Sequence, residues 1–163
     1  MKCFLKIFLA VVLLLSFSAC RKNTTISSTN AYSSFGAVGV GNELDGSMTV
    51  RAWGKGKDKA DALEQARKNA IHQVLFGGIQ QGEGTYNGRP LIYEVNAQTK
   101  YEYYFNAFFV DGGEYTKYAT FEDENRKARM VAKSNGLENW STIIRVKRSE
   151  LKSRLIEDGI IKP

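Results

Sequence analysis

Residues 48–78, MTVRAWGKGKDKADALEQARKNAIHQVLFGG, decide the fold of this chain. Apolar and polar residues alternate over 48–53, which is the pattern of a strand with one buried face. Gly54 and Gly56 interrupt the alternation, so the strand is expected to stop at these glycines. A strand that runs directly into a helical pattern predicts a domain containing both kinds of element.

A helix is predicted after this strand because its start, its apolar face and its end each have a signal. Asp58 is a suitable N-cap, Asp61 adds negative charge to the first turn, and Gly77 and Gly78 provide a stop. Arg67 lies inside the apolar arc, and we expect its head to extend past its neighbours into solvent. One half of the helical wheel collects Ala60, Leu63, Ala66, Ala70, Ile71, Val74 and Leu75.

Two glycine-rich segments flank these elements. Residues 36–41, GAVGVG, could form a loop or a weak edge strand. Residues 79–95 contain three glycines and a proline, which predicts a mobile loop.

The densest aromatic stretch of the chain follows this loop. Asn96 is a possible N-cap, and Gly112 and Gly113 are a possible end, so a helix is predicted between them. Its aromatic stripe could belong to the core or could form a partner-binding face whose tyrosine hydroxyls stay in water. The stripe consists of Ala97, Tyr101, Tyr104, Phe105, Phe108 and Phe109.

Three more segments, 114–121, 127–133 and 139–147, alternate with the period of a strand. Asn135 and Gly136 suit a tight turn before the last of them. A short helix is then expected from Ser149 to Gly159.

The predicted order of elements is therefore β-α-α-β-β-β-α. It indicates an α+β domain, with an antiparallel sheet of about four strands and helices packed on one face. Because no crossover helix separates the last three strands, we expect them to form an antiparallel meander.

Residues suited to catalysis are scarce. His72 is the only histidine, and its place on the polar side of the predicted helix suggests a solvated side chain. The loop at Gly54 to Gly56 lies between a strand and a helix but lacks the spacing of a phosphate-binding motif. We therefore expect a non-enzymatic protein with no catalytic residue, cofactor or metal.

The first twenty residues, MKCFLKIFLAVVLLLSFSAC, carry the features of an export signal. Lys2 and Lys6 precede an apolar run of nine residues, 7–15, which is too short to cross a bilayer as a helix. Small residues then precede Cys20. This ending resembles the lipobox of bacterial lipoproteins, which implies cleavage after residue 19 and lipidation of Cys20. An ordinary secretory signal with an incidental cysteine is the alternative.

The lipoprotein resemblance implies three parts: a signal peptide at 1–19, lipidated Cys20 with a flexible tether at 20–35, and one α+β domain at 36–163. The tether is rich in Ser, Thr and Asn and spans on the order of 20 Å. No Asp follows Cys20, which in lipoproteins of this kind implies the outer membrane of the cell envelope. Acyl chains would anchor the protein to the membrane without a spanning segment.

Positive charge is concentrated near the C-terminus. Residues 126–154 contain nine Lys or Arg and two Glu. Because nucleic acid is not expected in the envelope, the basic excess predicts contact with an acidic protein surface or with anionic lipid headgroups. A merely solvated basic face is the alternative. The predicted partner-binding residues are Arg129, Arg145, Lys147 and Arg148.

Two family resemblances cover parts of the domain. Over about residues 47–76, the strand that ends at Gly54 to Gly56 and the helix with Ala62, Ala66 and Ala70 at four-residue steps resemble small α+β domains of flagellar-assembly and related surface lipoproteins. The segments GKGKDKADALEQARKNAIHQVLF, YFNAFF, GGEY and LKSRLIEDGIIK resemble an uncharacterised lipoprotein family of Bacteroidota. Kinship with the lipoprotein subunit of the type VI secretion membrane complex of that phylum is the further implication.

These observations predict a docking or structural component of an envelope assembly, such as a trans-envelope secretion complex. The alternative is a lipoprotein that binds a small ligand or a glycan through exposed aromatic residues such as Trp53, Tyr86 and Tyr93. Exposed rings would favour the alternative, whereas a large apolar patch would favour docking.

Overall fold

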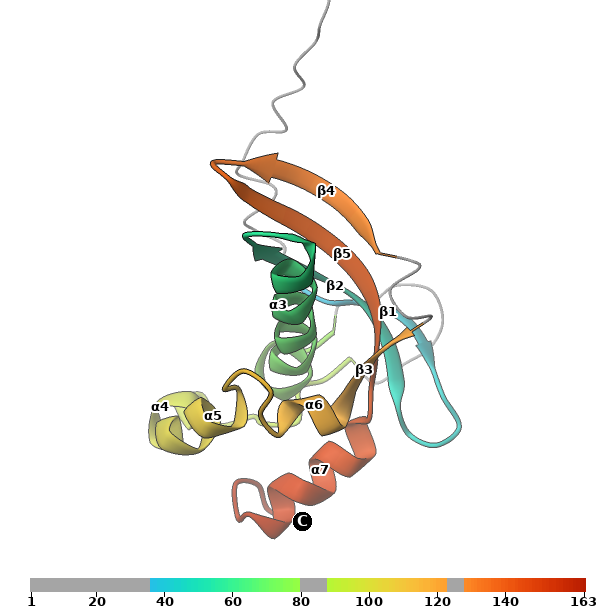
Figure 1. Ribbon diagram of the computed structural model, residues 1–163. Helices are drawn as coiled ribbons and strands as arrows, with labels where there is room; N and C mark the ends of the chain where they lie inside the picture. Colours follow the sequence, from blue (N-terminus) through green and yellow to red (C-terminus); the bar gives the residue numbers. More distant parts are fainter. Residues whose placement is uncertain (1–35, 80–87, 123–127) are drawn as a thin grey trace, which may run out of the picture.

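The computed structural model of the chain describes residues 36–79, 88–122 and 128–163 (Figure 1). The signal segment, Cys20, the tether and Tyr86 lie outside these ranges, so the predictions made for them remain predictions.

A five-stranded antiparallel sheet forms the centre of the domain. Its order is β1 (Val38–Asn42), β2 (Met48–Gly56), β5 (Leu137–Val146) and then β3 (Ala119–Phe121). β4 (Arg129–Ser134) also pairs with β5. Residues 36–41 therefore contribute to an edge strand, which is one of the two structures their sequence allowed.

β3 and β4 share one edge of β5. β2 occupies the other edge from Glu138 to Val146, so β4 pairs with the beginning of β5 and β3 pairs with its end. The meander predicted from the sequence is wrong in this respect, because β3 is not a neighbour of β4. Each of the two short strands gains its hydrogen bonds from the long strand β5 instead.

Helix α3 (Lys59–His72) packs on the concave side of the sheet, as Figure 1 shows. Asp58 caps this helix by accepting a hydrogen bond from the backbone of Asp61, as predicted. The close contact depends on Gly54: a Cβ atom there would lie 2.1 Å from the carbonyl oxygen of Ala62. The helix continues into a π-helical turn, η2 (Gln73–Gly77).

The remaining helices are short and lie on the same side of the sheet (Figure 1). They are α4 (Ala97–Lys100), α5 (Glu102–Phe108), α6 (Tyr115–Tyr118) and α7 (Arg148–Glu157). The α+β class and the placement of helices on one face, both predicted from the sequence, are confirmed.

Three local predictions differ from the structure. The single helix expected from Asn96 is divided at Tyr101 into α4 and α5. The strand expected over 114–121 begins as helix α6, and only its last three residues form β3. Within the segment expected to be a mobile loop, Leu91 is buried in the core and bonds through its N–H to the carbonyl of Val74.

The aromatic stripe belongs to the core, which was the first of its two interpretations. Phe105 and Phe108 are buried, and Tyr101, Tyr104 and Phe109 pack against them partly exposed. Aromatic rings contribute a large buried area per residue, which suits a domain without disulfides among its described residues.

Candidate partner-binding face

The face of the sheet that points away from α3 is defined by strand alternation. Gly54 and Gly56 point toward α3, so Trp53 and its alternate neighbours point the other way. We call this the outer face. Helices of the described segments lie on the opposite side (Figure 1). The outer face carries Thr49, Arg51, Trp53, Lys55, Thr120, Arg129, Ser141, Ile143 and Arg145.

Trp53, Ser141 and Arg129 form one row across three strands of the outer face. Trp53 is opposite Ser141 on one side of β5, and Arg129 is opposite the same serine on the other side. Neighbouring strands are about 5 Å apart, so the backbones of Trp53 and Arg129 are about 10 Å apart. Ser141 between them is 4 % exposed, so this row presents its two long side chains, Trp53 and Arg129, rather than the serine.

Arg51 lies beside this row. It is opposite Ile143, one alternate position along β5 from Ser141. Ile143 is 3 % exposed although it points away from α3. The accessible part of the outer face is therefore formed by the long side chains and not by an apolar surface.

Two arginines of the outer face are free of internal ion pairs. Within the described residues, neither Arg51 nor Arg129 has an acidic partner, and Arg129 is exposed at the start of β4. An arginine without an internal partner keeps its five donors for a ligand. Arg129 was predicted as a partner-binding residue from the sequence, whereas Arg51 was not, because Arg51 lies outside the basic segment 126–154.

Arg145 is engaged within the chain. Its Nη2 is 2.9 Å from Asp45 Oδ2, and its Nε donates to Ser47 Oγ at 3.0 Å. Hydrogen bonds from Ser47 to Asp45, followed by the charge of Arg145, lower the pKa of Asp45 below its usual value. Arg145 therefore fastens the β1–β2 loop to β5.

Lys147 and Arg148, the other two predicted residues, follow the end of β5. Lys147 Nζ is 3.2 Å from Glu150 Oε2, and Arg148 Nη2 donates to the carbonyl of Arg89 at 3.0 Å. Partial burial lowers the pKa of Arg148. The structure thus leaves Arg129 as the one member of the predicted set without an internal partner among the described residues.

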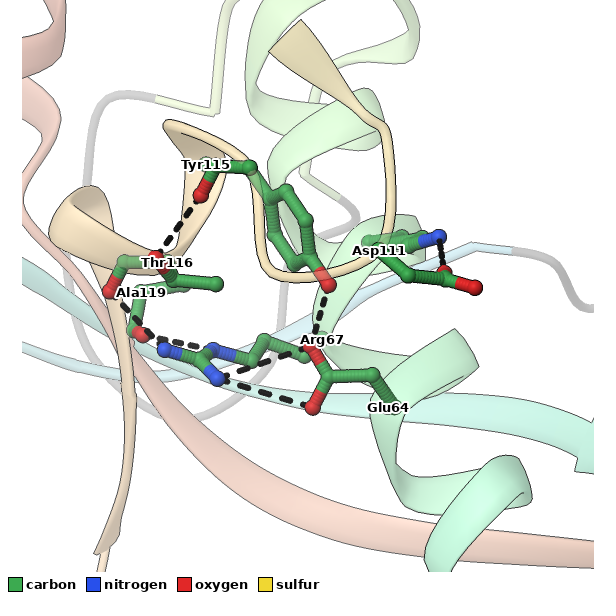
Figure 2. Close-up of polar contacts among 8 residues, drawn as sticks. Glu64, Arg67, Asp111, Tyr115, Thr116 and Ala119 are labelled. Atoms are coloured by element: carbon green, nitrogen blue, oxygen red, sulfur yellow. Dashed lines mark hydrogen bonds and ion pairs between the residues drawn. The ribbon is translucent and has the colours of Figure 1, made fainter.

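A second polar cluster joins α3 to the α6 and β3 segment (Figure 2). Arg67 does not reach into solvent as expected from the sequence. Its guanidinium group donates to the carbonyls of Thr116 and Ala119, both at 2.8 Å, while the Tyr115 hydroxyl donates to Glu64. These bonds satisfy backbone groups that the short helix α6 leaves unpaired, so the cluster is structural.

Burial, helped by the bond to Glu64, raises the pKa of the fully buried Tyr115 to about 12. A hydroxyl with this pKa remains protonated at neutral pH. It therefore acts as a hydrogen-bond donor to the carboxylate and not as a base.

His72 is more enclosed than its sequence position suggested. Its ring contacts Phe76 and Phe109, with centroids at 5.0 and 6.4 Å, and its Nε2 lies 3.1 Å from the amide nitrogen of Gln98. Burial lowers the pKa of His72. Its neighbours are therefore those of a packing residue.

Trp53 and Tyr93, the described aromatic residues proposed for glycan binding, lie in different parts of the domain. Trp53 is opposite Ser141 on the outer face, whereas Tyr93, which is well exposed, is close enough to Arg148 to influence its pKa. Arg148 comes seven residues after Ser141, which corresponds to roughly 20 Å of extended chain.

The described part of the chain contains no group of three or more His, Cys, Asp or Glu side chains arranged to hold a metal ion. None of the described helices has the length and hydrophobicity needed to cross a bilayer. Comparison with known protein families, curated proteins and solved structures found no match to this chain.

Proposed function

We propose that this chain is a lipoprotein of the bacterial cell envelope, anchored in the outer membrane through Cys20, whose domain docks an envelope protein with an acidic surface. The resemblance to lipoproteins of secretion assemblies suggests the class of complex in which such a component would act. The function is recognition and not catalysis.

The single observation that carries the docking role is the pair Arg51 and Arg129 on the outer face. Both are free of internal ion pairs among the described residues, and they flank β5 beside Trp53. Interfaces are enriched in arginine and tryptophan because these side chains combine a large contact area with directed hydrogen bonds. An acidic partner would supply the charge that the outer face lacks.

The proposed lipid anchor at Cys20 is consistent with a docking role, because it would keep the domain at the membrane surface. Two or three acyl chains on Cys20 would hold the protein permanently at the membrane, because each buried methylene contributes about 0.8 kcal/mol. The tether would then let the domain search a volume above the membrane for its partner.

Charge reversal on the outer face tests the docking role. Intact cells expressing Arg51→Glu with Arg129→Glu would be crosslinked, and the proteins captured with the domain compared with those of the wild type. The matched control is Lys152→Glu with Lys162→Glu, two exposed residues outside the sheet. We expect the outer-face variant to lose its partner and the control to keep it. Equal capture by both variants would contradict the docking role of this face.

A further inference from the structure

β4 has a free edge and is the most exposed strand of the sheet. β4 pairs only with β5 among the described strands, so every second residue directs its N–H and C=O groups away from the sheet. Five of its six residues are exposed. Met130 and Val131 are 48 % and 40 % exposed, which places apolar side chains beside these backbone groups.

The register of β4 specifies what a strand added to this edge would meet. On the outer face, the row Trp53, Ser141 and Arg129 ends at Arg129, so the next residue of that row would lie beside a guanidinium group. On the opposite face, the row of Trp140 ends at Met130. Cross-strand neighbours have Cβ atoms about 5 Å apart, so an acidic residue would suit the first row and an apolar residue the second.

Charge disfavours a second copy of this chain as the added strand. β4 holds two basic residues, Arg129 and Lys133, and no acidic one, so the β4 strand of a second copy would offer no carboxylate to Arg129. The irregular register between Met130 and Ala132 disfavours regular pairing of β4 with any added strand. The choice between a second copy and an acidic partner strand therefore rests on charge.

We propose that β4 binds an extended segment of an acidic partner protein by strand addition, with an Asp or Glu of that segment beside Arg129 and the adjacent apolar residue beside Met130. This inference rests on the proposed docking function and specifies its binding mode. The backbone of β4 supplies affinity in this mode, and Arg129 supplies selectivity.

A synthetic peptide is the probe. The peptide is threonine-valine-glutamate-valine-threonine-valine-threonine with a fluorescein label at its N-terminus and an amidated C-terminus. The anisotropy of this label is followed while the full lipidated chain in detergent is added. A second peptide has lysine in place of glutamate. Two further versions are N-methylated, one at the valines and the other at the remaining residues, because only alternate N–H groups of an added strand face its neighbour.

We expect the glutamate peptide to bind at least tenfold more tightly than the lysine peptide, and Arg129→Glu to reverse this preference. One N-methylated version should lose binding and the other should keep it. Equal binding by both N-methylated versions, a preference unchanged in Arg129→Glu, absence of binding at millimolar peptide, or a dimer that blocks β4 would each overturn strand addition.

The experiments distinguish a failure of strand addition at β4 from a failure of the docking role of the outer face. Arg51 lies on β2, two strands away from the free edge of β4. If Arg51→Glu alone reduces capture of the envelope partner while the peptides fail, docking stands and strand addition does not. If the peptides bind as expected while Arg51→Glu and Arg129→Glu leave capture unchanged, the docking role fails.

Discussion

Arg145 Nη2 lies 2.9 Å from Asp45 Oδ2, although the two residues are 100 positions apart in the chain. This ion pair joins the loop between β1 and β2 to the middle strand of the sheet. Ser47 takes part by accepting from Arg145 Nε and by donating to Asp45. A residue that its sequence position suggested for partner binding therefore ties the β1–β2 loop to β5.

The first prediction concerns this pair. Arg145→Glu would place two carboxylates together and remove the donor to Ser47, so the midpoint of thermal unfolding should fall measurably. Arg129→Glu is the control, and its free energy of unfolding should change by less than about 0.5 kcal/mol because Arg129 is exposed and unpaired within the described residues. Identical melting curves for the two variants would show that the pair does not stabilise the loop.

The second prediction concerns the contact between sheet and helix. Gly54→Ala should destabilise the domain by about 3 kcal/mol or more, because the added Cβ would meet backbone atoms of Ala62 and Ala66 within 2.2 Å. Gly41→Ala is the control, since a Cβ at this position meets nothing within 4 Å. Urea unfolding of both variants measures the difference, and a mild effect of Gly54→Ala would mean that α3 packs less closely than described.

The third prediction concerns the cluster around Arg67. Tyr115→Phe removes the hydroxyl that donates to Glu64 without changing the packing of the ring, which is 0 % exposed. The loss should be about 1.5–3 kcal/mol, the usual value for a hydrogen bond to a charged group. Tyr103→Phe, at a position 91 % exposed, should be neutral in the same chemical unfolding experiment. Equal stability of the two variants would refute the structural role of this bond.

The fourth prediction is a pH dependence that arises from His72. Because burial lowers its pKa in the folded state, the unfolded chain takes up a proton first as the pH falls below 6.5. The associated stability is present above pH 6.5 and is lost as the pH falls through the folded-state pKa. Unfolding measured from pH 7.5 to 5 should show this loss in the wild type and a flatter profile in His72→Gln. An unchanged profile in the variant would assign the loss to other groups.

Local signals in the sequence were sufficient for several elements. Asp58 caps α3, and Asn135 and Gly136 form the turn between β4 and β5 with positive φ angles of 51° and 73°. Both depend on residues within a few positions of one another. The sheet partners of β3 could not be predicted in the same way, because β5 satisfies its hydrogen bonds from a distant part of the chain.

The candidate site was predictable only in part for the same reason. Arg129 stood out within a basic segment, but the ion pair of Arg145 with Asp45 depends on a loop far away in sequence. Arg51 joins Arg129 only when β2 and β4 lie on either side of β5. The alternation over 48–53 already placed Arg51 opposite the apolar face, and that signal could have identified it.

Photo-crosslinking from Val131 of β4 tests the central claim most directly, because this exposed position leaves Arg51 and Arg129 intact. A photoreactive phenylalanine analogue would replace Val131 in one strain and the exposed Lys152 of α7 in another, and both would be irradiated in intact cells. We expect an adduct with an acidic envelope protein from position 131 and none from position 152. No adduct from position 131, or the same adducts from both positions, would contradict docking through the outer face and its β4 edge.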